Sequence, residues 1–205
     1  MVATSLQKFE FGNIALQLVV PNSLAVKHWF ETEKQQNENT PFPFWAKVWP
    51  SAIALSKFLV TKQHYVANKK VLELASGLGL PSLVAAQFAT TVTCSDYLIE
   101  PLQFVEQSIS INNLFNIDCK IINWNNLSPN IVTDVLLLSD INYNPSTFDS
   151  LFNMLEQFLK NGSTIILSTP QRIMAKKFIE AILPHCVEQK EIEIDAVIIS
   201  ILVLK

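Results

Sequence analysis

Cysteine, glycine and charge are all scarce in this chain. Its 205 residues include three cysteines and four glycines, and only 16% are Asp, Glu, Lys or Arg. The cysteines, Cys94, Cys119 and Cys186, are odd in number and form no CxxC pair. This pattern argues against a disulfide scaffold and favours a reduced, cytoplasmic location.

Long hydrophobic runs and blocks of like charge are also missing. The longest apolar run, residues 196–204, is too short to cross a bilayer and predicts a buried strand, so no membrane partner is expected. The opening MVATSLQKFEFG lacks the apolar core of a secretory signal. The net charge is −3 without clustered Lys and Arg, which argues against a nucleic-acid backbone as the main partner but leaves open an RNA held by a local patch.

Apolar side chains, by contrast, are abundant. They make up 49% of the chain, with 13 Phe and 4 Trp, which is ample for the core of a single domain over residues 1–205. Two short strand patterns flank Gly12-Asn13, and a helix capped by Ser23 is expected over residues 23–34. A polar, proline-bearing loop then separates this N-terminal appendage, residues 1–40, from a core over residues 41–205.

Strand and helix patterns alternate along the core. The predicted fold class is α/β, a Rossmann-like doubly wound and mostly parallel seven-stranded sheet with an antiparallel last strand. The last two strands are joined too tightly for a helix and should pair antiparallel. The expected strands are 69–75, 91–96, 119–124, 135–138, 163–169, 186–194 and 197–204, and the helices are 50–62, 80–88, 100–113, 146–160 and 171–182.

The most informative segment is VLELASGLGLP, residues 71–81. It is a strand pattern that ends in a turn with two of the four glycines, Gly77 and Gly79, and a helix pattern follows. Asp96 comes nineteen residues after Gly77, at the end of the next strand. Strand, glycine turn, helix, strand and acid form the layout of a nucleotide-binding βαβ unit.

The same segment indicates which kind of cofactor would bind. The third glycine of the dinucleotide pattern is missing, and Pro81 removes an N–H donor from the first turn of the helix. Glu73 lies inside a buried strand, where a cationic cofactor would explain its charge. S-adenosylmethionine, which carries an ammonium and a sulfonium and no phosphate, fits these features. A salt bridge to Lys69, Lys70 or another basic residue is the alternative for Glu73.

Asp96 is expected to accept hydrogen bonds from ribose hydroxyls, a role compatible with capping the helix over residues 100–113. The three histidines, His28, His64 and His185, show no ligand spacing, and no metal site is predicted.

The segments VLELASGLGLP, CSDY and LLLSDINY together resemble a class I, seven-strand S-adenosylmethionine-dependent methyltransferase. Three further features are similar to the protein-lysine methyltransferase-like family with a DxxY motif. They are the run FWAKVWPSAIALSKFL, Trp124 after the third strand, and Asp140-Ile141-Asn142-Tyr143 as D-x-x-Y. The resemblance covers roughly residues 42–170.

The resemblance implies a cofactor site and an acceptor site. Asp140 and Tyr143 would border the place where the methyl acceptor enters. One departure is Ala75, which stands where the family usually has glycine. The residues implied or predicted to bind the cofactor are Trp49, Glu73, Ala75, Ser76, Gly77, Gly79, Asp96, Trp124 and Ser139.

The resulting hypothesis is an S-adenosylmethionine-dependent N-methyltransferase acting on a lysine amine of a protein, with Asp140 and Tyr143 orienting the amine. A small-molecule or RNA methyltransferase of the same fold is one alternative, although DINYNP lacks the [ND]PP[YF] run of adenine and glutamine methylating enzymes. A non-catalytic cofactor-binding module is the other. The tryptophans could also be core aromatics, and Tyr143 with Asn144-Pro145 could anchor a loop.

Overall fold

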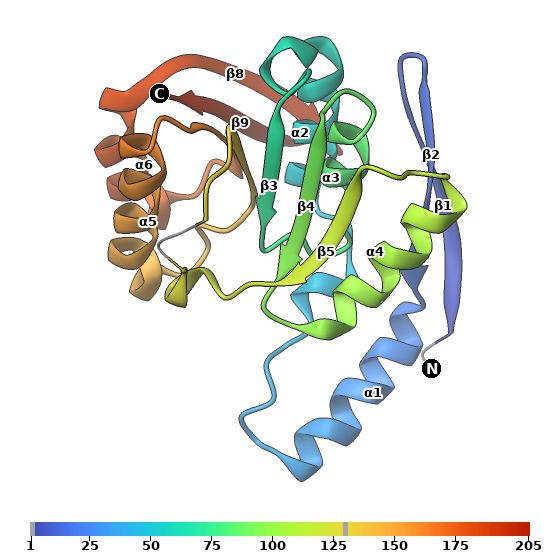
Figure 1. Ribbon diagram of the computed structural model, residues 1–205. Coiled ribbons are helices and arrows are strands. Elements are labelled where there is room, and N and C mark those ends of the chain that lie inside the picture. Colours follow the sequence, from blue (N-terminus) through green and yellow to red (C-terminus); the bar gives the residue numbers. More distant parts are fainter. Residues whose placement is uncertain (1–2, 129–130) are drawn as a thin grey trace.

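A mostly parallel seven-stranded sheet organises residues 3–128 and 131–205, the part of the chain that the computed structural model describes (Figure 1). β9 runs antiparallel to both of its neighbours, and the other pairs are parallel, so the predicted fold class is confirmed. In spatial order the strands are β5 (Ile117–Ile121), β4 (Thr91–Asp96), β3 (Lys70–Leu74), β6 (Val135–Ser139), β7 (Thr164–Pro170), β9 (Val197–Leu204) and β8 (Cys186–Ile194).

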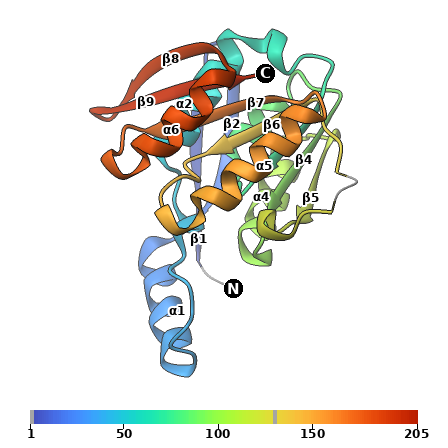
Figure 2. The same ribbon diagram turned by 90° about the vertical axis from the view of Figure 1, so that its left-hand side faces the viewer.

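Helices cover both faces of this sheet because alternate side chains of each buried strand point to opposite faces. Val71 packs in a core shared with α2 (Pro50–Thr61) and α3 (Leu80–Ala85), whereas the next residue, Leu72, packs with α5 (Phe148–Lys160) and α6 (Lys176–Ile182). α4 (Ile99–Ile111) contacts β4 and β5. α5 and α6 lie together on the face turned toward the viewer in Figure 2.

The N-terminal appendage is a two-stranded hairpin followed by a helix. β1 (Thr4–Phe11) and β2 (Ile14–Pro21) pair antiparallel around Gly12-Asn13, as predicted. β2 packs on α4, where Ser108 Oγ accepts the N–H of Val19 at 2.9 Å, and apolar β2 side chains join the core of α2 and α3. α1 (Ser23–Gln36) extends beyond the sheet at the bottom of both views.

The cap predicted for α1 is wrong by one residue. Asn22, and not Ser23, is the N-cap, and its Oδ1 accepts the N–H groups of Leu24 and Ala25 at 3.0 and 3.2 Å. Asparagine is as good a capping residue as serine, so the choice depends on where the extended backbone of β2 ends.

Three elements of the core differ from their expected bounds by three residues or more at one end, and several others differ by one or two residues. α3 ends at Ala85, because the next residues turn so that Asn68 can donate to the carbonyl of Phe88. β5 begins at Ile117, in register with Val92, and ends before Trp124, which lies in a short 3-10 helix. The segment before α6 is extended at Arg172 and becomes α-helical only at Lys176. Among the described residues, no helix has both the length and the apolarity to span a bilayer.

Candidate active site

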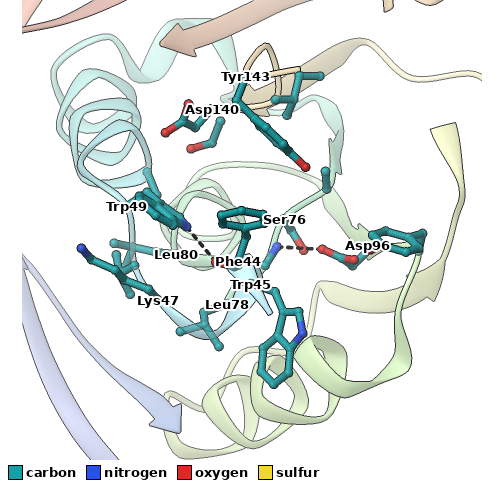
Figure 3. Close-up of a pocket in the computed structure, with 18 of the residues that line it drawn as sticks. Phe44, Trp45, Lys47, Trp49, Ser76, Leu78, Leu80, Asp96, Asp140 and Tyr143 are labelled. Atoms are coloured by element: carbon teal, nitrogen blue, oxygen red, sulfur yellow. Dashed lines mark hydrogen bonds between the residues drawn. The ribbon is translucent and has the colours of Figure 1, made fainter. Parts of the chain in front are cut away.

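A cavity opens at the carboxyl ends of β3, β4 and β6 (Figure 3). The chain leaves β3 toward β4 and β5 on one side and returns through β6 on the other, so the cavity lies at the switch point where ligands bind open α/β sheets. Ten of the eleven residues predicted from the sequence line it: Trp49, Ala75, Ser76, Gly77, Gly79, Asp96, Trp124, Ser139, Asp140 and Tyr143.

The glycine turn forms the floor of the cavity. Gly77 and Gly79 have φ angles of +53° and +68°, a left-handed region that favours glycine. A Cβ on Gly79 would lie 2.9 Å from the Sγ of Cys94, whereas one on Gly77 would lie 3.4 Å from the carbonyl oxygen of Trp45. Both glycines are therefore needed for conformation, and Gly79 is needed for space as well.

Asp96 is tied to the glycine turn. Its Oδ2 accepts the N–H of Gly77 at 3.0 Å, drawn as a dashed line in Figure 3, and its Oδ1 accepts the N–H of Leu98 at 3.2 Å. Burial raises the pKa of this carboxyl above its ordinary value, while the backbone donors act in the opposite direction. Leu98 is the N-cap of α4, so the expectation that Asp96 caps this helix is wrong. A carboxylate offers about four lone-pair sites, so these backbone donors leave Asp96 able to accept from a ligand.

Aromatic and small side chains form the walls. Trp49 is the residue before α2, and its Nε1 donates to the carbonyl of Phe44 at 2.8 Å. Trp124 lies in the 3-10 helix after β5 and also packs against the core under α5. Ser139 is the last residue of β6.

Glu73 is the one predicted site residue that does not line the cavity. It is fully buried in β3, where its Oε2 accepts from the backbone N–H and the Oγ of Ser82 at 2.9 and 2.5 Å. Among the described residues Glu73 forms no ion pair with Lys69, Lys70 or another basic residue. Instead, the Glu73 carboxyl joins β3 to the first turn of α3, and so holds together the two elements that flank the glycine turn.

Burial raises the pKa of the Glu73 carboxyl well above its ordinary 4.5, despite the two donors on Ser82. Above pH 4.5 the unfolded chain has lost this proton and the folded chain still holds it, so this group's contribution to stability is lost as pH rises through the folded pKa. We expect Glu73→Gln to gain in urea midpoint relative to the wild type as pH rises from 4.5 to 9. Glu106→Gln is the matched control, because Glu106 is exposed. A difference in urea midpoint between Glu73→Gln and the wild type that stays constant with pH would contradict the raised pKa of Glu73.

Asp140 and Tyr143 also line the cavity, and Figure 3 shows the side chain of Tyr143 pointing into it. Asp140 directly follows β6 and has a left-handed φ of +59°. Its Oδ1 forms an ion pair with Nη1 of Arg172 at 2.5 Å. Tyr143 is half-exposed, and burial together with the carboxylates of Asp96 and Asp140 raises the pKa of its phenol.

Sequence reasoning missed several residues of the cavity. Phe42 and Phe44 come from the proline-bearing loop and are 58% and 48% exposed, which is unusual for phenylalanine. Their rings lie 4.8 Å apart, and Phe44 contacts the rings of both Trp49 and Tyr143. The run PFPFW, with three aromatics in a proline-bearing loop, is the signal that could have identified them.

Arg172 was also missed, although it follows β7 at the same sheet edge as the other site residues. Polar residues just after parallel strands are the general signal for such sites. In the part of the chain that is described, no group of three or more His, Cys, Asp or Glu could hold a metal ion.

This chain belongs to the lysine methyltransferase family, whose model matches residues 33–185. The assignment made from the sequence motifs is thereby confirmed. The fold and the cavity at the switch point are those of a class I methyltransferase. One solved structure of similar fold is a Streptococcus mutans protein proposed to be a SAM-dependent methyltransferase, with a TM-score of 0.68 and 14% identity, covering 100% of this chain and 56% of that one.

Two curated relatives show the range of acceptors among similar proteins. The histone-arginine methyltransferase METTL23 of Xenopus laevis is 31% identical over 110 residues, which are 51% of this chain and 47% of the relative. The electron transfer flavoprotein beta subunit lysine methyltransferase of Danio rerio is 29% identical over 164 residues, 78% of this chain and 60% of the relative. The chain thus spans about half the length of the first relative and somewhat more of the second.

Proposed function

We propose that this chain methylates a lysine amine of a protein, with S-adenosylmethionine as the methyl donor. The observation that carries the proposal is that one cavity contains both the Asp96–Gly77 turn and the DxxY pair, Asp140 and Tyr143. Family membership and the protein substrates named for the relatives support it.

The residues present fit this cofactor. The hydroxyls of a ribose would be held by Asp96, whose lone pairs are only partly used, and an adenine would pack beside Trp124. Among the described residues that line the cavity, the basic side chains are Lys47, which lies over the ring of Trp49, and Arg172, which pairs with Asp140. Since both already have partners within the described part of the chain, the site suits a cofactor without a phosphate.

On the acceptor side, the protein supplies position and desolvation. S-adenosylmethionine supplies an electrophilic methyl group on a sulfonium. Placing the amine in line with it is worth on the order of 7–11 kcal/mol. A lysine must first lose its proton, which costs about 4.6 kcal/mol at pH 7 from an ordinary pKa near 10.4. Asp140 and Tyr143 would orient the amine, while its proton leaves to solvent at the open mouth.

Cofactor binding is testable before any substrate is known. With S-adenosylhomocysteine at one hundred times its Kd, we expect the free energy of unfolding to rise by about 2.7 kcal/mol. Asp96→Asn removes the carboxylate charge and should weaken this effect, whereas the exposed Asp149→Asn should not. No shift in the wild type would contradict a cofactor site in this cavity.

The substrate class is tested by transfer of labelled methyl in a lysate, which is then split into protein, RNA and small-molecule fractions. We expect label in the protein fraction and, after hydrolysis, in methyl-lysine. Label confined to RNA or to small molecules would overturn the proposal.

Two further parts of the proposal concern context. Residues 1–205 are taken as a single methyltransferase domain, supported by the packing of β2 against α4 and by its share in the core of α2 and α3. A cytoplasmic location is proposed as well, supported by three free cysteines. Imaging of a fluorescent fusion would test the location.

A further inference from the structure

We propose that Arg172 is a positioning residue that offsets the charge of Asp140 and so makes the site selective for an amine that can lose its proton. The inference deepens the proposed function, on which it rests. It explains how a carboxylate at the acceptor site avoids holding the acceptor in its unreactive, charged form.

The geometry of the pair carries the inference. Nη1 of Arg172 lies 2.5 Å from Oδ1 of Asp140, and both residues line the cavity. The side chains are 26% and 9% exposed, so solvent screens their interaction less than that of a surface pair. Since Arg172 takes Oδ1, Oδ2 remains available to accept a hydrogen bond from an incoming amine.

The presence of an arginine at position 172 also supports the inference. Arg172 is the only arginine in the chain, and the other fourteen basic residues are lysines. Arginine keeps its charge at every physiological pH. A permanent cation is thus present at the one place where the charge of Asp140 must be offset.

Few other charges face Asp140. Tyr143 lies three residues on, Asp96 faces it from the end of β4, and Lys47 lines the cavity from the segment before α2. The Nζ of Lys47 is 4.9 Å from the centre of the Trp49 ring, and no ion pair of Lys47 with Asp140 is present among the described residues. Arg172 is therefore the cation that compensates Asp140.

The consequence concerns the acceptor. An uncompensated carboxylate favours the charged form of a neighbouring lysine and raises its pKa by roughly 1–3 units. Paired with Arg172, Asp140 can orient the amine with less of this effect. The Asp140–Arg172 pair does not help an arginine acceptor in the same way. The guanidinium of such an acceptor stays protonated, and the charge of Arg172 repels it.

The test compares Arg172→Gln, which removes the charge, with Arg172→Lys, which keeps it. Initial rates of transfer from labelled S-adenosylmethionine into the protein fraction of a lysate are measured between pH 6.5 and 11. For Arg172→Gln we expect a rate about tenfold below the wild type from pH 7 to 9, with the gap narrowing to about threefold by pH 11, as a one-unit rise from an amine pKa near 10.4 requires. Arg172→Lys should lie much closer to the wild-type profile.

Three outcomes would overturn the inference: an unchanged profile, a loss that keeps the same size up to pH 11, or an Arg172→Lys rate that falls as far below the wild type as that of Arg172→Gln at pH 7 to 9. The Kd of S-adenosylhomocysteine, measured for each variant, separates loss of the acceptor effect from damage to the cofactor site. The proposed function is judged separately, because it fails if the wild-type chain puts no label into protein.

Discussion

Replacing Asp140 with Asn is expected to lower turnover on the true protein substrate roughly 100-fold, the size of effect seen when one hydrogen-bonding group aimed at a reacting centre is removed. The variant keeps the shape of the side chain, and Asn tolerates the left-handed φ of +59° at this position. It loses the negative charge that holds Arg172 and that would accept from the amine. The affinity for S-adenosylhomocysteine should stay close to that of the wild type.

Rates of methyl transfer and calorimetry with S-adenosylhomocysteine check this prediction together. Asp149→Asn is the matched control, because Asp149 is an exposed acid in the first turn of α5 and does not line the cavity. Undiminished turnover in Asp140→Asn would show that the carboxylate has no part in orienting the acceptor.

The second large effect is expected at Gly79. Its φ of +68° disfavours any L side chain, and an added Cβ would lie 2.9 Å from Cys94 Sγ and 3.0 Å from a methyl carbon of Val105. We expect Gly79→Ala to lower the free energy of unfolding by about 2–5 kcal/mol, through left-handed strain and overpacking together. Binding of S-adenosylhomocysteine should weaken as well, since the turn lines the cavity.

Gly162→Ala separates the two causes. Gly162 also has a positive φ, +81°, but an added Cβ would meet no atom within 4 Å. The free energy of unfolding of Gly162→Ala should therefore fall only by the left-handed strain, about 1–2 kcal/mol. Urea denaturation of Gly79→Ala and Gly162→Ala measures the difference. Equal losses in the two variants would mean that the contact with Cys94 and Val105 relaxes without cost.

The sequence was a good guide wherever a local pattern decides the structure. The strands and the glycine turn follow from apolar runs and from residues with special backbone freedom, and these signals are contained within a few neighbouring positions. Ten site residues were predicted because each lies in or beside such a pattern or matches a family motif.

The misses have different physical causes. Nothing near Arg172 in sequence shows that its partner is Asp140, thirty-two residues earlier. Glu73 was expected to meet a ligand, and instead its partner is Ser82, in the first turn of the next helix. Phe42 and Phe44 were missed because aromatic side chains usually indicate a core, although the PFPFW run offered a signal.

The ends of β3 and β6 carry a conformational cost. Ala75 and Asp140, which directly follow these neighbouring strands, both adopt left-handed φ angles without being glycine, +52° and +59°. Each such residue carries about 1–2 kcal/mol of strain, which surrounding contacts must hold in place. Selection for heat resistance alone would therefore favour glycine at these two positions, and the relaxed variants would aim the acceptor site less accurately.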